Sequence, residues 1–197
     1  MFGQPIHPPA EAGGFSQFLD TIVAQDHVDS ILDIGCGEGA NVRMAARKDL
    51  YAVGLDREPF AIQSAKAGAF DENLDSDTSF LVSDALRLPF SDHSFDIVLD
   101  HGCFHHLEKS HQEQYMENIT SILKPRGYFI LEVFSRKHKG YGVMPQSGWH
   151  IKGGVYRRFF SQEDIQELLR VEFEVLSFQE KQGDIAGDWH VLARMKY

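Results

Sequence analysis

One stretch decides the fold, Ile31-Leu32-Asp33-Ile34-Gly35-Cys36-Gly37-Glu38-Gly39. Its first four residues are mostly aliphatic and predict a strand, and glycine then takes every second position. Residues 40–48 follow with the pattern of a helix. A strand, a glycine-rich turn and a helix in this order are typical of a segment that binds a phosphate or a nucleoside. An ordinary tight loop is the alternative, so the rest of the chain has to decide between the two.

Length and composition indicate one globular domain. The chain has 197 residues, 43% of them hydrophobic and 24% charged, so we expect a single domain over residues 1–197. No apolar run approaches the ~20 residues of a membrane span, and the first residues do not resemble a signal peptide. Two cysteines are too few for a disulfide scaffold, so a cytoplasmic protein is expected. The net charge of −10 argues against a nucleic-acid partner.

Helical and strand-like segments alternate along the chain. Residues 1–14 read as an irregular arm, and apolar spacing predicts a helix from 15 to 23, so residues 1–27 form an N-terminal arm and helix. Further helices are predicted at 40–48, 59–69, 112–123 and 161–170, and strands at 31–34, 51–55, 80–82, 94–99, 128–134, 173–179 and 189–195. The last two strands are expected to form a hairpin. This alternation predicts an α/β fold with a doubly wound parallel sheet.

Acidic residues follow several of the predicted strands. In a doubly wound sheet, ligands bind beyond the carboxyl ends of the strands. Asp56 stands at such an end, 21 residues after Gly35, where a carboxylate can accept both hydroxyls of a ribose. Asp84 follows the next strand, and Asp100 follows the one after it. A surface acid at the start of a loop is the alternative interpretation of Asp56.

Five motifs in register resemble those of the class I S-adenosylmethionine-dependent methyltransferases. They are Leu32-Asp33-Ile34-Gly35-Cys36-Gly37-Glu38-Gly39, Gly54-Leu55-Asp56, Ser83-Asp84-Ala85, Phe95-Asp96-Ile97-Val98 and Leu123-Lys124-Pro125-Arg126-Gly127. The resemblance covers roughly residues 30–195. It implies a Rossmann-like, doubly wound sheet of seven strands with the last strand antiparallel, and S-adenosyl-L-methionine as the cofactor.

The resemblance also implies which residues bind the cofactor. Asp33 would organise the glycine turn or meet the amino group of the methionine moiety, and Asp56 would bind the ribose. Asp84 would accept a hydrogen bond from the adenine amine, while the N–H of Ala85 donates to the ring. The full set of candidate cofactor-binding residues is Asp33, Gly35, Cys36, Gly37, Asp56, Arg57, Asp84, Ala85 and Asp100.

A dinucleotide cofactor is a competing interpretation. The spacing of Gly35, Gly37 and Ala40 fits the dinucleotide fingerprint, and Asp56 fits its ribose-binding acid. An NAD-dependent oxidoreductase is therefore one alternative. Against it, Asp33 and Glu38 of the turn and Asp84 of the third strand end would repel a pyrophosphate. A sulfonium cofactor is positively charged at sulfur and tolerates these acids.

The segment after the fourth strand reads Asp100-His101-Gly102-Cys103-Phe104-His105-His106-Leu107. The methyl group is expected to face this segment, and Gly102 allows close approach of the backbone. Small-molecule methyltransferases of the thiopurine and tellurite type carry Asp-Arg-Gly here, and His101 replaces the arginine. The closing stretch Asp188-Trp189-His190-Val191-Leu192 also resembles that group.

Histidines in this segment are candidate catalytic residues. A histidine with a pKa near ~6.5 suits proton removal at neutral pH, so we assign His101 and His105 to the acceptor side as possible general bases. The alternative is that they cap the following helix or line the pocket. No pair of His or Cys residues has the spacing of a known zinc motif, so no metal site is expected.

Residues 135–160 form a long connection with five glycines and several aromatic residues. A connection of this length in a compact domain is usually functional or disordered, and its aromatic content argues against disorder. We therefore expect a substrate wall or lid here, completed by the N-terminal arm.

The sequence predicts an enzyme that transfers a methyl group from S-adenosylmethionine to a small-molecule acceptor, with a thiol or another small nucleophile favoured. The alternatives are a module that binds the cofactor without methyl transfer, and the NAD-dependent oxidoreductase. The oligomeric state and the identity of the acceptor are not indicated.

Overall fold

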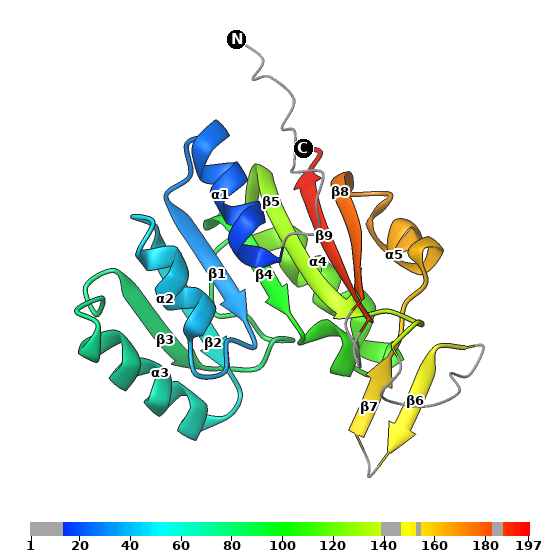
Figure 1. Ribbon diagram of the computed structural model, residues 1–197, viewed down its shortest axis with the longest axis horizontal. Coiled ribbons are helices and arrows are strands. Elements are labelled where there is room, and N and C mark those ends of the chain that lie inside the picture. The colour runs from blue at the N-terminus through cyan, green and yellow to red at the C-terminus, as the bar shows by residue number, and fades with distance from the viewer. Residues whose placement is uncertain (1–13, 139–146, 153–154, 183–186) are drawn as a thin grey trace.

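A computed structural model describes residues 14–138, 147–152, 155–182 and 187–197. One seven-stranded sheet runs through it in the order β3-β2-β1-β4-β5-β9-β8 (Figure 1). Its strands are β1 (Ser30–Ile34), β2 (Tyr51–Asp56), β3 (Thr78–Val82), β4 (Phe95–His101), β5 (Leu123–Phe134), β8 (Phe173–Gln182) and β9 (Gly187–Met195). β9 pairs antiparallel with β5 and β8, whereas the pairs among β1 to β5 are parallel. The predicted fold is confirmed.

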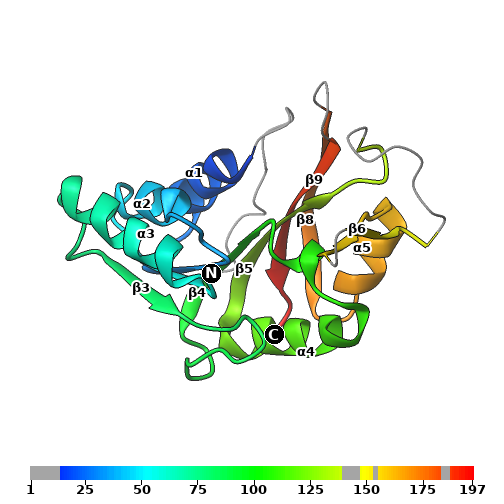
Figure 2. The same ribbon diagram turned by 90° about the horizontal axis from the view of Figure 1, so that it is seen from below.

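Helices cover both faces of the sheet. α1 (Phe15–Gln25), α2 (Ala40–Ala46) and α3 (Pro59–Asp71) lie on one face, and α4 (Gln112–Ile122) and α5 (Gln162–Leu169) on the other (Figure 2). Successive residues of a strand point to opposite faces. Accordingly Ile31 packs in the core beneath α1 to α3, while Leu32 packs in the core beneath α4 and α5. This double burial explains why the strands read as continuous apolar runs.

The strand order reverses between β1 and β4, which lie side by side. In an open α/β sheet the ligand-binding crevice forms at such a reversal, beyond the carboxyl ends of the strands. Two short 3₁₀ turns, Phe104–His106 and Lys109–His111, follow β4 at this edge and lead into α4. The fold therefore places the segment after β4 beside the glycine turn after β1.

Two segments differ from the sequence-based expectation. The predicted strand at 128–134 is longer in the structure, because β5 already begins at Leu123 and pairs there with Phe95 before the register shifts. The long connection at 135–160 contains an antiparallel pair of strands, β6 (Trp149–Lys152) and β7 (Val155–Arg158). Aromatic and β-branched residues such as Trp149, Ile151 and Val155 favour strands, and this signal outweighs the glycine content of the segment. The remaining parts, 139–146 and 153–154, lie outside the described residues.

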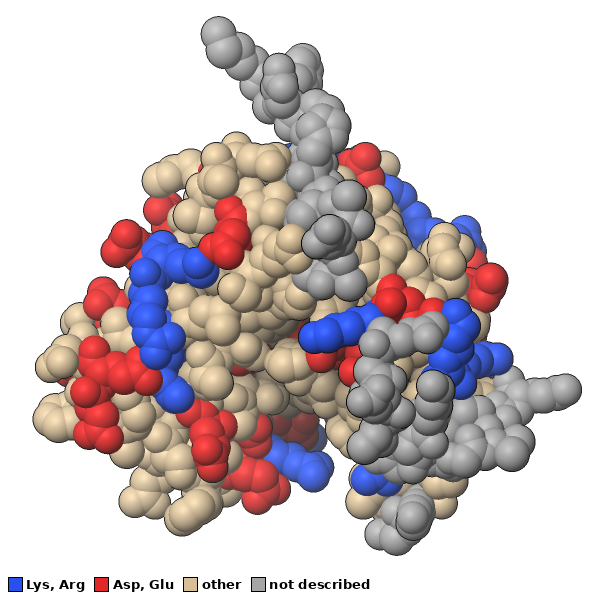
Figure 3. Space-filling view, viewed as in Figure 1, with Lys and Arg blue, Asp and Glu red and all other residues tan. Residues whose placement is uncertain are grey.

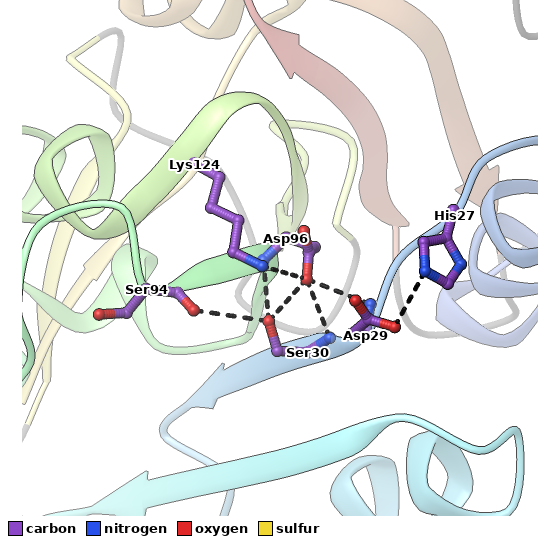
Figure 4. Close-up of polar contacts among 6 residues, drawn as sticks. All are labelled: His27, Asp29, Ser30, Ser94, Asp96 and Lys124. Carbon is purple, nitrogen blue, oxygen red and sulfur yellow. Dashed lines mark hydrogen bonds and ion pairs between the residues drawn. The ribbon is translucent and has the colours of Figure 1, made fainter.

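Asp96 ties together the other end of the sheet (Figure 4). Its Oδ2 accepts hydrogen bonds from the backbone N–H groups of Asp29 (3.1 Å) and Ser30 (3.0 Å) and from the Ser30 hydroxyl (2.7 Å). The Lys124 ammonium donates to the same oxygen at 2.8 Å. Burial alone would raise the pKa of Asp96, but the hydrogen bonds from Lys124 and Ser30 outweigh it and hold the pKa below its ordinary value. One carboxylate thus joins β1, β4 and β5.

We expect Asp96→Asn to lower the free energy of unfolding by about 1.5–3 kcal/mol at neutral pH, the scale of hydrogen bonds to a charged group. Because the folded-state pKa is lowered, this stabilisation is present above the ordinary carboxyl pKa and is lost as pH falls through the lowered value. The difference between the wild type and the variant should therefore shrink below about pH 4. Urea unfolding at neutral and acidic pH measures it, with the exposed Asp75→Asn as control. Equal stability of Asp96→Asn and wild type at neutral pH would contradict the assignment.

Candidate functional site

The glycine turn after β1 is held against β2 by backbone hydrogen bonds. The N–H groups of Gly35 and Cys36 both donate to the carbonyl of Leu55, at 2.8 and 2.9 Å. Gly35 and Gly37 have φ values of +76° and +52°, which side chains rarely adopt. A Cβ on Gly35 would lie 3.0 Å from the Cβ of Cys103, whereas a Cβ on Gly37 would meet no atom within 4 Å. The turn therefore presents open backbone at Gly37, where a ligand can approach.

Asp56 and Asp84 lie at the edge where β2 and β3 end. Asp56 Oδ2 accepts from the N–H of Gly37 at 3.0 Å, and Oδ1 accepts from the N–H of Glu58 at 2.9 Å. Asp84 Oδ1 accepts from the N–H of Leu86 at 2.9 Å. A carboxylate offers about four acceptor positions, so both retain capacity for a ligand. The side chain of Arg57 is 85% exposed and faces Glu58.

Asp33 is buried at the end of β1 without a partner. Neither of its oxygens accepts a hydrogen bond from the described part of the chain, and the residue is 2% exposed. Burial, and then the nearby Asp100 and Asp56, raise the pKa of Asp33 to about 7, against the opposing effects of His101 and of the neighbouring Asn41 side chain. A buried carboxylate with no donor is costly and calls for a donor from a ligand. Asp33, with the open turn beside it, therefore fits a cofactor that carries positive charge.

Asp100 is fully buried and fixes the segment that follows β4. Its oxygens accept from the N–H groups of Cys103 at 2.9 Å and Phe104 at 2.9 Å, and from the hydroxyl of Tyr115. Burial raises the pKa of Asp100 to about 6, although these hydrogen bonds oppose the rise. The structure thus shows Asp100 positioning the 3₁₀ turn, and a direct contact with the cofactor stays a prediction.

His101 is hydrogen-bonded at both ring nitrogens. The side-chain amide of Asn41 donates to Nδ1 at 3.0 Å, and Nε2 lies 2.7 Å from Oε1 of Glu132. Glu132 also lies 3.4 Å from Nε2 of His190. The bond to Glu132 raises the pKa of His101, and burial opposes it. Glu132 was not among the predicted site residues, although a lone acid within the apolar run of β5 was a signal that could have found it.

His105 has a different environment. Its ring stacks on Phe134 with centroids 3.8 Å apart, and the residue is 4% exposed. Its Nδ1 is buried without a hydrogen-bond partner in the described residues. Burial lowers the pKa of His105 well below its ordinary value, so the ring is neutral. The next residue, His106, bonds through Nδ1 to the carbonyl of Tyr156 in β7 at 3.1 Å.

Two adjoining cavities open at this edge, of about 400 and about 240 Å³. Both are lined by His101, Glu132 and Asp188. The larger also reaches Asn41 and His190, and the smaller reaches Gly102, His105 and Phe134. Neither is lined by Asp56 or Asp84, which lie farther along the same edge. The candidate cofactor residues and the candidate acceptor cavities are thus neighbours at the reversal of strand order.

The thiols of Cys36 and Cys103 lie near the glycine turn. Burial raises the pKa of each far above its ordinary value, and the carboxylates Asp33 and Asp56 contribute to both shifts. Cys36 packs against Gly54, where a Cβ would lie 2.8 Å from its Sγ. These are protonated packing thiols rather than nucleophiles.

Across the described ranges no three His, Cys, Asp or Glu side chains form a group suited to a metal ion. Within the same ranges, no helix is both long and apolar enough to span a bilayer.

On the face seen in Figure 3, Lys and Arg side chains are interspersed with Asp and Glu. Such mixed charge differs from the extended basic surface that binds a phosphate backbone.

The chain resembles known methyltransferases in sequence. Residues 31–127 match the family described as a methyltransferase domain. The 2-heptyl-1-hydroxyquinolin-4(1H)-one methyltransferase of Mycobacteroides abscessus is 32% identical over 130 residues, which make up 66% of this chain and 57% of that protein. The chain spans about half the length of the curated relatives it matches.

Solved structures share the fold. The 1,6-didemethyltoxoflavin-N1-methyltransferase of Burkholderia thailandensis, crystallised with 1,6-didemethyltoxoflavin and S-adenosylhomocysteine, has a TM-score of 0.77 and 20% identity over 92% of this chain and 76% of its own. The [4+2]-cyclase SpnF has a TM-score of 0.73 and 19% identity over 99% of this chain and 88% of its own. These findings show a methyltransferase-domain match over residues 31–127, and they show that the described sheet shares its fold with methyltransferases of known structure.

Proposed function

We propose that the protein transfers the methyl group of S-adenosyl-L-methionine to a small-molecule acceptor. The observation that carries the proposal is the line of acids at the strand ends, Asp33, Asp56 and Asp84, beside the open backbone at Gly37. A pyrophosphate would be repelled by this line, whereas a cationic cofactor is attracted. The cavities begin where this line ends, at His101.

Different residues of this chain bind the different parts of the cofactor. Asp56 binds the ribose hydroxyls, Asp84 and Ala85 bind the adenine, and the turn at 35–37 lies against the methionine moiety. Asp33 meets positive charge there, because its buried oxygens make no well-formed hydrogen bond within the described residues, although the Asn41 side chain lies close by. Arg57, exposed beside Asp56, remains a prediction as a cofactor contact. When bound, the cofactor supplies a methyl group activated by a positive sulfonium.

The protein contributes alignment. Well-oriented reactants reach effective molarities on the order of 10⁵ M or more, so holding the acceptor in line with the methyl is the main task of the cavity walls. His101 keeps no free ring nitrogen in this arrangement, and His105 presents a neutral ring in the smaller cavity. We keep both as candidate catalytic residues on the acceptor side.

The volumes of the cavities and the names of the related proteins both support a small acceptor. The related proteins act, by their names, on a hydroxyquinolinone and on 1,6-didemethyltoxoflavin, which are small molecules. The described strand β7 of the connection at 135–160 serves as a wall in this proposal, since His106 of the turn after β4 bonds to its Tyr156. The N-terminal arm at 1–13 lies outside the described residues. Membership of the thiopurine and tellurite group and a cytoplasmic location stay predictions.

A module that binds the cofactor without transferring methyl is the second candidate. The likeness to the [4+2]-cyclase SpnF supports keeping it, because that protein is named for a different reaction. A screen of small methyl acceptors that follows release of S-adenosylhomocysteine separates the two. Tight cofactor binding without turnover of any acceptor would favour the module.

We expect S-adenosylhomocysteine to bind and NAD not to bind in titration calorimetry. Asp56→Ala should weaken S-adenosylhomocysteine binding by about 1.5–3 kcal/mol, because a charged hydrogen-bond acceptor of the ribose is lost. Asp75→Ala removes an exposed acid of the same charge and should leave the affinity unchanged. An unchanged affinity of Asp56→Ala would remove Asp56 from the ribose site, and binding of NAD alone would reverse the cofactor assignment.

His101→Ala and His105→Ala should leave the affinity for S-adenosylhomocysteine nearly intact, because neither residue lies in the nucleoside region. At least one should lower turnover of an acceptor found in the screen by ~10²-fold, the low end of general acid–base assistance. His105→Phe keeps an aromatic ring against Phe134 and tests the nitrogen atoms alone. His27, whose side chain is 91% exposed, provides the control His27→Ala. Full turnover in all these variants would place the base elsewhere or show that none is needed.

A further inference from the structure

Asp188 is a carboxylate that the proposed function leaves unused. It lies at the start of β9, opposite Phe134 of β5 and Lys181 of β8 in the sheet register. It lines both cavities, and its Oδ1 is buried without a hydrogen-bond partner in the described part of the chain. A buried polar atom without a partner is rare and demands an explanation. Because Asp188 lines both cavities, a ligand bound there that donates a hydrogen bond to its carboxylate would supply a partner.

The other polar groups of the smaller cavity have their hydrogen bonds. Glu132 is occupied by His101 and faces His190, and His101 is held by Glu132 and Asn41. His105 is the exception, because its buried Nδ1 also has no hydrogen-bond partner in the described residues. The smaller cavity thus contains two groups with unused capacity, Asp188 and His105, and both can accept a hydrogen bond from a bound molecule.

The charges around Asp188 are mixed but include a second carboxylate. Burial and then Glu132 raise the pKa of Asp188, while His138, His190 and His101 oppose the rise. Two carboxylates, Glu132 and Asp188, therefore line one small cavity, and Asp33 and Asp100 lie close enough to His101 to affect its pKa. A ligand group that gains positive charge is favoured in such surroundings.

The pKa values of the chain's own thiols indicate how this edge of the sheet affects the ionisation of a thiol. Burial, followed by Asp33 and Asp56 for Cys36 and by Asp100, Asp56 and Asp33 for Cys103, raises the pKa of each thiol. An acceptor thiol must ionise to become a good nucleophile. Next to Asp188 and Glu132 it would meet the same opposition from negative charge. The site is therefore poorly suited to a thiol acceptor, which differs from the sequence-based preference for a thiol.

We propose that the acceptor is a neutral amine whose N–H group is bound by Asp188, an inference that rests on the proposed methyl transfer. The nitrogen lone pair forms the bond to the methyl carbon as the carbon–sulfur bond breaks, and the electron pair of that bond stays on sulfur. Positive charge passes from sulfur to nitrogen, where the Asp188 carboxylate stabilises it in the transition state. One proton then leaves the nitrogen for Asp188 and passes to water.

Aniline and thiophenol provide a matched pair of probes, because they share a ring and differ in the nucleophilic atom. Each is incubated with the full chain and S-adenosylmethionine, and release of S-adenosylhomocysteine is measured. Aniline should be methylated faster than thiophenol. Asp188→Asn keeps the shape but removes the charge, and it should lower kcat on aniline at least about 10-fold. The same variant should leave the rate on thiophenol unchanged or raise it, because a repulsive charge near a thiolate is gone.

This opposite response distinguishes a role in the reaction from damage to the fold, which would lower both rates. S-adenosylhomocysteine affinity of Asp188→Asn should match the wild type, and Asp75→Asn serves as the control for removal of an aspartate. Faster turnover of thiophenol than aniline, equal loss of both rates in Asp188→Asn, or turnover of neither probe despite cofactor binding would overturn the amine assignment. Failure of S-adenosylhomocysteine to bind the wild type would instead overturn the proposed function itself.

Discussion

The carboxylate of Asp100 is the constraint on which the site depends. It is fully buried, and it joins the end of β4 to the turn at Cys103 and Phe104 and to Tyr115 of α4. Because Asp100 precedes residues 101–102 and its partners Cys103 and Phe104 follow them, these hydrogen bonds fix the backbone in between. His101 then meets Asn41 and Glu132, and Gly102 borders the smaller cavity. A single buried acid, stabilised by three donors, thus sets the boundary between the cofactor residues and the acceptor cavities.

Several carboxylates lie along the edge where the parallel strands end, and their mutual repulsion and burial destabilise their charged forms. Burial together with neighbouring carboxylates raises the pKa of Asp33 to about 7, which means that its charged form is destabilised in the folded protein. Groups with such strongly shifted pKa values cluster at ligand-binding and catalytic sites. Asp33 on the cofactor side and Asp188 on the acceptor side each have a buried oxygen without a partner in the described residues. A cation or a hydrogen-bond donor from a ligand would stabilise either carboxylate. The cofactor side and the acceptor side of the site therefore favour ligand groups of the same kind.

The sequence was sufficient for the features that local pattern encodes. Apolar runs and their spacing predicted the strands and helices, and strand ends predicted that Asp56, Asp84 and Asp100 would lie along one edge. The pairing of Glu132 with His101 could not be derived in this way, because it depends on the register between β4 and β5. The strands β6 and β7 were not predicted, because the glycines of the segment favoured a loop and its aromatic residues were interpreted as a substrate wall.

The direction of β9 explains why Asp188, named only as part of a closing stretch, was not among the predicted site residues. Parallel strands place their carboxyl ends at the ligand edge, so attention falls on the residues that follow each strand. β9 runs the opposite way, and its first residues lie beside the last residues of β5, Asp188 beside Phe134 and His190 beside Glu132. An antiparallel strand therefore delivers residues from its amino end to the same edge. Because β9 lies between β5 and β8, its first residues, Asp188 and His190, line the larger cavity. If β9 ran parallel to β5, these residues would lie at the opposite edge of the sheet.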